Sequence, residues 1–64
     1  MVYIAIEGNL WYGSVTPLEV NNCNVESYTT INHSEDEECG WYVFKITNIN
    51  SETNARIIFD WYTD

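Results

Sequence analysis

Two runs of apolar residues in the last third of the chain, joined by a short polar link, constrain the fold more than any other feature. The runs cover residues 41–49 and 55–62, and the link covers residues 50–54. β-Branched and aromatic residues dominate both runs, and a short link rich in Ser and Asn between such runs is typical of a β-hairpin. The sequence therefore predicts that the two runs pair as antiparallel strands.

A turn over residues 50–53 would set the register of this predicted hairpin. It would place Phe44 opposite Phe59 and Tyr42 opposite Trp61 on one apolar face, because successive strand residues point to opposite sides of a sheet. A register shifted by one residue would bury three charged side chains instead. The first register is therefore favoured, and its apolar face is assigned to the core.

The start of the chain predicts a second hairpin. Its two strands would flank Gly8-Asn9, a two-residue link of the kind that favours tight hairpin turns. One face of this hairpin is apolar and is assigned to the core. The other face would bring Tyr3 and Tyr12 close to Glu7.

The middle of the chain combines a helix signal, a strand signal and an acidic segment. Residues 16–19 have the spacing of a helix capping box with Pro at the first helical position. This predicts a short helix near residues 17–24, although the Asn residues that follow are poor helix formers and a loop is the alternative. Residues 25–31 alternate as in a β-strand, and residues 32–40 are polar enough to form a loop.

These elements predict one small domain spanning residues 1–64. Its fold class is mostly β, a small antiparallel sheet or barrel-like domain of four or five strands with one short helix allowed near residues 17–24. A chain of this length buries only about 60% of its unfolded surface, so its core is thin. The predicted core side chains are Val2, Ile4, Ile6, Trp11, Val15, Leu18, Val25, Tyr42, Phe44, Ile46, Ile57, Phe59 and Trp61.

The charge of the chain restricts its partners. Ten acidic residues stand against Lys45 and Arg56, for a net charge of −8. Such a balance opposes direct binding to nucleic acid, which proteins achieve by neutralising phosphates, and it opposes attraction to anionic membranes. It favours a protein partner with a basic surface, or solubility alone.

The start of the chain has neither the basic segment of a signal peptide nor a long apolar run. We therefore expect a cytoplasmic protein, in the cytoplasm of the host cell if a phage encodes it. In that compartment Cys23 and Cys39 would be reduced thiols by default, although a disulfide remains open because sequence cannot show their separation.

No pattern of catalytic, cofactor-binding or metal-ligating residues stands out, so we expect no enzyme and no cofactor. Cys23, His33 and Cys39 lack the close Cys pair of a structural zinc site, and the consecutive acids lack the alternating spacing of a calcium loop. A Cys–His nucleophile is formally available, but so small a domain offers little room for a closed pocket. The Gly residues are isolated, which excludes a Gly-rich phosphate loop.

The pattern that favours a function is the placement of acids beside aromatic residues on the predicted outer faces. One group would be Glu7 with its two Tyr neighbours, and another would be Asp60 with Trp41 and Tyr62. The segment of four consecutive acids leads through Cys39 and Gly40 into Trp41. The predicted partner-binding residues are Tyr3, Glu7, Tyr12, Glu35, Asp36, Glu37, Glu38, Trp41, Asp60 and Tyr62.

This arrangement leads to the hypothesis of a nucleic-acid mimic. Alternate strand residues repeat at about 6.6–6.8 Å, which is close to the spacing of successive phosphates, and an aromatic ring can take the place of a base. The chain would then be a small acidic inhibitor or decoy, by analogy of size and charge with the counter-defence proteins of bacteriophages. Its partner would be the basic nucleic-acid-binding surface of a host enzyme, such as a nuclease, restriction, CRISPR or DNA-repair protein.

Two other functions are kept as alternatives. The chain could be a protein–protein interaction module or a homodimer that uses exposed aromatic faces without mimicry, and its binding would then depend little on salt. A carbohydrate-binding role, with exposed Trp rings beside acid acceptors, ranks below both because nothing in the sequence indicates export.

Overall fold

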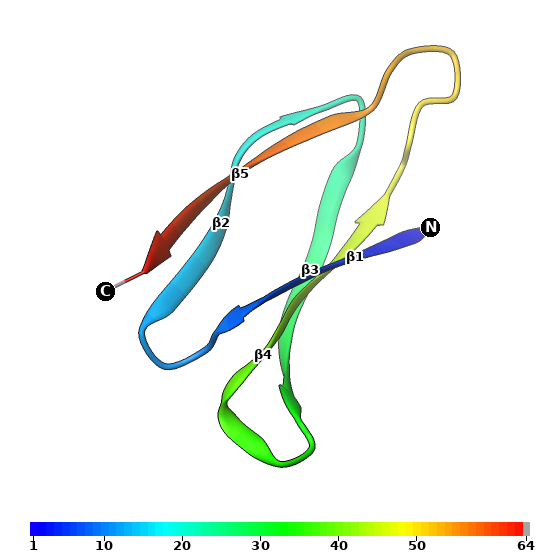
Figure 1. Ribbon diagram of the computed structural model, residues 1–64. Coiled ribbons are helices and arrows are strands. Elements are labelled where there is room, and N and C mark those ends of the chain that lie inside the picture. The colour runs from blue at the N-terminus through cyan, green and yellow to red at the C-terminus, as the bar shows by residue number, and fades with distance from the viewer. Residues whose placement is uncertain (64) are drawn as a thin grey trace.

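The computed structural model describes residues 1–63, which form five β-strands and no helix (Figure 1). All strand pairs are antiparallel, and the strands form a three-stranded sheet of order β1-β4-β3 and a two-stranded sheet of order β2-β5. The expectation of a small antiparallel β domain of four or five strands is confirmed. The strands are β1 (Val2–Asn9), β2 (Gly13–Asn21), β3 (Asn24–His33), β4 (Asp36–Thr47) and β5 (Arg56–Thr63).

Strand β4 is the centre of the molecule, because it pairs with β1 on one side and with β3 on the other. Alternate side chains of β4, those of Tyr42, Phe44 and Ile46, point to the second sheet and are buried. Val15 of β2 is buried beside them from the facing sheet. The alternation of apolar residues along β4 thus produces the core between the two sheets.

The predicted C-terminal hairpin is wrong in its pairing but right about which side chains meet. Strand β5 pairs with β2 and not with β4. Nevertheless the rings of Phe44 and Phe59 lie 4.9 Å apart, and those of Tyr42 and Trp61 lie 5.8 Å apart. Since β4 and β5 belong to different sheets, these pairs meet across the core. Asn48 has a φ of 52° directly after β4, which redirects the chain away from a hairpin.

The predicted N-terminal hairpin is also wrong. Strand β1 continues through Gly8 and Asn9 alongside β4, and the N–H of Leu10 donates to the carbonyl of Glu38 at 2.7 Å. The chain turns only afterwards, where the side-chain oxygen of Asn9 accepts the backbone N–H groups of the two residues before β2, at 2.9 and 2.6 Å. This Asx turn leads the chain to the second sheet.

The helix predicted near residues 17–24 is absent, because residues 13–21 form β2 and the chain then turns at Asn22, which has a φ of 61°. Pro17 is tolerated in a strand because β2 is an edge strand, where the missing N–H costs no ladder bond. A β-bulge follows it, between Pro17 and Glu19. The helix-capping spacing of residues 16–19 favours a helix only locally, and the pairing of β2 with β5 outweighs this local preference.

The core prediction is correct for the strand interiors and wrong at four positions. The bulge in β2 turns Leu18 outward, where it is 70% exposed, and Trp11 lies in the link between β1 and β2 at 60% exposure. Val2 and Trp61 are also partly exposed. Leu10 and Cys23 pack against the core in their place.

The strand predicted over residues 25–31 is confirmed as β3, whose pairing with β4 has two irregularities, one near each end. A bulge between Val25 and Ser27 shifts its alternation. As a result Val25 packs against the core, and Tyr28 also turns inward so that its ring lies 5.1 Å from that of Phe44.

The hydroxyl of Tyr42 ties the link between β1 and β2 to the core. It is within hydrogen-bonding reach of the carbonyl oxygens of Asn9 and Gly13, the latter at 2.7 Å. We expect Tyr42→Phe to lower the free energy of unfolding by about 1–2 kcal/mol, because the carbonyls lose a partly buried donor. Denaturant unfolding measures this loss, and Tyr12→Phe, which removes an exposed hydroxyl, is the matched control. Equal midpoints for the two variants would contradict this account of the link.

A candidate protein interface at the acidic end

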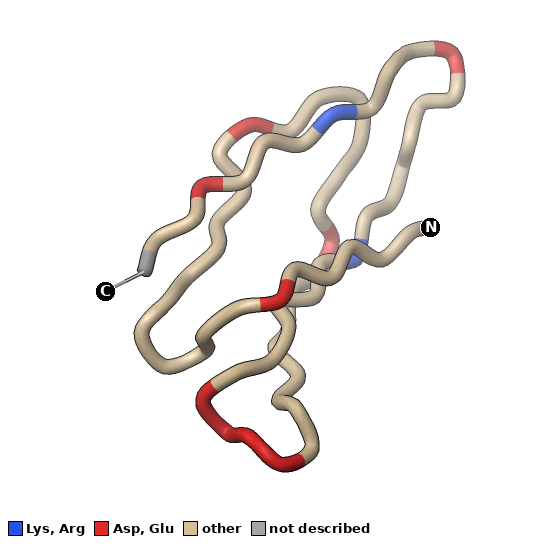
Figure 2. The backbone as a smooth tube through the Cα atoms, viewed as in Figure 1, with Lys and Arg blue, Asp and Glu red and all other residues tan. Residues whose placement is uncertain are grey.

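The acidic residues are unevenly distributed over the molecule (Figure 2). The segment 35–38 lies at the tip of the β3–β4 hairpin, which projects at one end (Figure 1). Glu7 lies close by on β1, directly opposite Trp41 of β4. We call residues 35–38 the acidic tip, and the acidic tip together with Glu7 the acidic end. Five of the ten acidic residues of the sequence thus gather in one region.

The acidic tip is not the long loop that its composition predicts. Strand β3 continues to His33 and β4 begins at Asp36, so only Ser34 and Glu35 form the turn between them. The prediction that residues 32–40 form a loop is therefore wrong, although the expected exposure at a tip is correct for Glu35, Asp36 and Glu37. Strand pairing extends further because adjacent backbone groups satisfy one another in the hairpin.

Hydrogen bonds hold the acidic tip in one conformation. The carboxylate of Asp36 accepts the N–H groups of Glu38 at 2.9 Å and Cys39 at 3.3 Å. The side-chain amide of Asn32 donates to the carbonyl of Glu37 at 2.6 Å, and that of Asn9 donates to the half-buried carboxylate of Glu38 at 2.8 Å. The carboxylates that face solvent are thus carried on an ordered backbone.

The backbone hydrogen bond from Glu38 is the main reason why the pKa of Asp36 lies below its ordinary value of 3.8. A lowered pKa means that the charged carboxylate stabilises the folded tip above pH 3.8, and that this contribution is lost as the pH falls through the folded-state pKa. We expect the amide resonance of Glu38 to follow this protonation in an NMR pH titration, with a midpoint below 3.8. A midpoint at or above that value would contradict the hydrogen-bonded tip.

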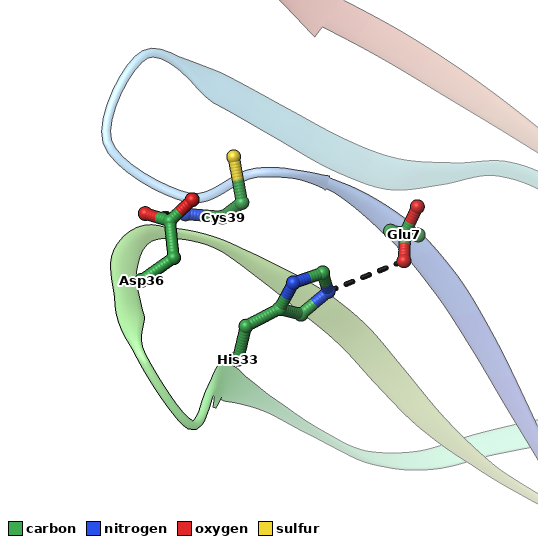
Figure 3. A network of polar contacts seen from close by, with 4 residues as sticks. All are labelled: Glu7, His33, Asp36 and Cys39. Atoms are coloured by element: carbon green, nitrogen blue, oxygen red, sulfur yellow. Dashed lines mark hydrogen bonds and ion pairs between the residues drawn. The ribbon is translucent and has the colours of Figure 1, made fainter.

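Beside the acidic tip, the imidazole of His33 packs against the indole of Trp41, with ring centres 4.3 Å apart and planes tilted at 43°. The Nε2 of His33 lies 3.2 Å from the Oε2 of Glu7 (Figure 3). His33 faces Asp36 across the hairpin. The sequence did not single out this position for binding. The only feature that could have indicated this position is the strand register. It places His33 and Trp41 on one face once residues 32–40 form a hairpin and not a loop.

Cys39 adjoins the same cluster and is poorly suited to act as a nucleophile. Burial, followed by the neighbouring carboxylate of Asp36, raises the pKa of its thiol, so the reactive thiolate is disfavoured at neutral pH. Both Cys23 and Cys39 are free thiols in the structure.

The predicted pairs of acids and aromatics are regrouped by the actual strand order. Tyr3 and Glu7 share the outer face of β1 as predicted, but Trp41 joins Glu7 and not Asp60, because β4 and β5 lie in different sheets. Asp60 is exposed on β5, opposite Thr16. Tyr12 and Trp11, in the link between β1 and β2, line a shallow depression together with Tyr62 of β5.

Neither cation of the chain lies at the acidic end. The Nζ of Lys45 is 3.2 Å from the carboxylate of Glu26, in the middle of the three-stranded sheet. Arg56 begins β5 and lies opposite Asn21 of β2, in the two-stranded sheet. The acidic end therefore combines five acidic residues with neither cation.

Within residues 1–63, no three or more His, Cys, Asp and Glu side chains are grouped so that they could hold a metal ion. The same residues include no helix that could span a membrane. Comparisons with protein-family models, curated proteins and solved structures found no match to this chain, so the functional argument depends on its own residues.

Proposed function

We propose that this protein is a small, acidic, non-catalytic inhibitor that binds the basic nucleic-acid-binding surface of another protein through its acidic end. One observation carries the proposal: five of the ten acidic residues gather at one end, where neither Lys45 nor Arg56 lies. Like charges held together repel one another, so such a cluster is unfavourable for the free protein and becomes favourable against a basic surface.

The geometry of the acidic end suits this role in two ways. Its backbone is already ordered by Asp36, Asn32 and Asn9, so little conformational entropy would be lost on binding. The adjacent rings of Trp41 and His33, tilted at 43° to each other, lie beside the carboxylates, as bases lie beside phosphates. Together these features imitate a charged strand with an aromatic neighbour.

The size, charge and expected cytoplasmic location of the chain fit a counter-defence protein of the kind bacteriophages produce. Its target would then be a host enzyme that handles nucleic acid, such as a nuclease or a restriction, CRISPR or DNA-repair protein. This finer assignment rests on analogy of size and charge. It predicts a partner with a basic groove and no direct contact between this chain and DNA, RNA or membrane.

A second candidate rests on exposed aromatic side chains of the β1–β2 link and of β5. Trp11, Tyr12 and Tyr62 lie around one shallow depression and are 60%, 55% and 61% exposed. Aromatic side chains of this kind dominate many protein interfaces. A partner bound there would be held by apolar contact, and its affinity would change little with salt.

Affinity capture from a host-cell lysate distinguishes the two. The immobilised chain is loaded at low salt, washed in steps of rising salt, and the released proteins are identified by mass spectrometry. Release of one nucleic-acid-handling enzyme at moderate salt is the expected result, since binding by charge weakens as salt screens it. A single partner that stays bound at high salt would favour the aromatic depression, and release of many basic proteins together would contradict a specific inhibitor.

A further inference from the structure

Each sheet of this small domain ends in strands with an unpaired edge. In the three-stranded sheet, β4 is central and β1 and β3 lie at the two edges. An edge strand presents a row of N–H and C=O groups that can pair with another strand, and proteins usually protect such edges with charges, Pro or bulges. Comparing how each edge is protected therefore indicates which edge can pair with another strand.

Strand β3 is the longest edge and the least protected. Of its ten residues, only Glu26 is charged when His33 is neutral, and Glu26 is 3.2 Å from Lys45. Strand β3 has register irregularities between Val25 and Ser27 and between Asn32 and His33, but residues 27–32 between them pair regularly with β4. These six residues contain no charge, no Pro and no Gly, and they are rich in β-branched and aromatic side chains. Segments of that composition pair readily with other strands.

The other edges are better protected. Strand β2 contains Pro17 and a bulge directly after it, and β5 carries Arg56 and Asp60. Strand β1 carries Glu7, and Trp61 of β5 packs directly against Gly8 near its end. The open edge of β3 is thus the exception in this molecule.

Apolar surface accompanies the free edge of β3. Tyr28 and Ile31 are 53% and 52% exposed although both lie within the strand. On the inner side, a groove of about 390 Å³ opens between β2 and β3, and Tyr28 and Phe44 contribute to its lining together with Val15 and Pro17. A strand added to β3 would lie along this groove and would place its own inward side chains over it.

We infer that the occupant of this edge is a second copy of the same chain, with the two β3 strands paired antiparallel around a two-fold axis near Thr29. The two sheets would then form one sheet of order β1-β4-β3-β3-β4-β1. The Tyr28 side chains of the two copies would lie next to each other on the inner face, and the two grooves would merge and be covered.

The distribution of charge favours this occupant, even though each copy carries a net charge of −8. Antiparallel pairing sends the two acidic tips to opposite ends of the dimer. The ten residues of β3 span about 33 Å at about 3.3 Å per residue, several times the Debye length of about 8 Å at physiological salt. The tips would therefore repel each other little, and nothing charged would be buried at the centre. A basic partner, by contrast, would be attracted to the acidic end and not to this uncharged edge.

The test is the mass of the purified chain in solution. We expect sedimentation equilibrium to show a monomer that becomes a dimer between about 1 μM and about 1 mM. Raising the salt should leave the dimer intact or strengthen it, because salt screens the repulsion between the two acidic copies. NMR spectra recorded over the same concentration range should show shifts in residues 27–32 and not in residues 2–6. A monomer at every concentration would overturn the inference.

Two matched variants locate the interface. Thr29 and Ala5 are both exposed and lie in one row of the sheet, each opposite Val43, but on opposite edges. Thr29→Asp, which puts two like charges near the two-fold axis, should weaken the dimer by about tenfold or more, since directly opposed like charges are unfavourable. Ala5→Asp adds the same charge at the other edge and should leave the dimer unchanged. If Ala5→Asp has the equal or larger effect, the β3 interface is wrong.

Discussion

Reversing two charges at the acidic tip, Glu35→Lys with Glu37→Lys, is expected to slow association with the target by about tenfold or more at low salt. Both side chains are exposed, and neither makes the hydrogen bonds that hold the tip, so the fold should not change. The loss follows from electrostatic steering, which raises the association rate of oppositely charged surfaces. Stopped-flow or surface-plasmon-resonance kinetics with the captured enzyme measure it.

The matched control is Glu19→Lys with Glu52→Lys, two exposed acids that lie in β2 and in the link between β4 and β5, outside the acidic end. Both double variants have the same net charge, so they differ only in where the charge is placed. The control should slow association by less than about threefold, because charges beyond a Debye length of the contact are largely screened. Equal rates for the two variants would show that only the net charge matters and would remove the acidic tip from the mechanism.

Phe44→Ala is expected to unfold the protein or to leave it barely folded. Phe44 is almost completely buried, and its ring contacts those of Phe59 and Tyr28. Removing a buried Phe side chain costs about 3–5 kcal/mol, a large part of the total stability of so small a domain. Far-UV circular dichroism and thermal unfolding measure the loss.

The effect of Leu18→Ala on stability tests whether Leu18 is exposed, as in the structure, or buried, as the sequence predicts. The sequence predicts that Leu18 is a core residue, whereas the structure places it outward after the bulge in β2, at 70% exposure. The structure therefore predicts a change within about 0.5 kcal/mol, as for most exposed positions. A loss of several kcal/mol would mean that β2 lacks the bulge and that Leu18 is inside.

The fold class and the inward face of β4 were predictable because both depend on alternation along a single strand. Tyr42, Phe44 and Ile46 repeat with the period of a strand, and any compact arrangement buries them together. The same pattern does not say whether the facing apolar surface belongs to a neighbouring strand or to a facing sheet. The contact of Phe44 with Phe59 was therefore expected correctly for the wrong reason.

The pairing partners depend on contacts between distant residues, and local patterns do not contain them. The left-handed backbone of Asn48 and the hydrogen bond from Leu10 to Glu38 are two such determinants. The helix signal at residues 16–19 illustrates the opposite case. A complete capping pattern was present, yet pairing of β2 with β5 within the two-stranded sheet made the strand more favourable.

The sequence predicted that the acids of the candidate site would be exposed, but it did not predict which other residues would lie beside them. The four consecutive acids were expected in solvent, and three of them are exposed there. Their proximity to Glu7 depends on the pairing of β1 with β4, and the contact of His33 with Trp41 depends on the extension of the β3–β4 hairpin. Residues far apart in the sequence thus become one surface only through the tertiary fold.

The central claim, that the acidic end occupies a nucleic-acid-binding surface, is tested most directly by competition. A labelled DNA or RNA is bound to the captured enzyme, this protein is titrated in, and fluorescence anisotropy reports the release of the nucleic acid. The account predicts full displacement that weakens with rising salt and that is impaired by Glu35→Lys with Glu37→Lys. A stable complex that holds the enzyme, the nucleic acid and this protein together would contradict it.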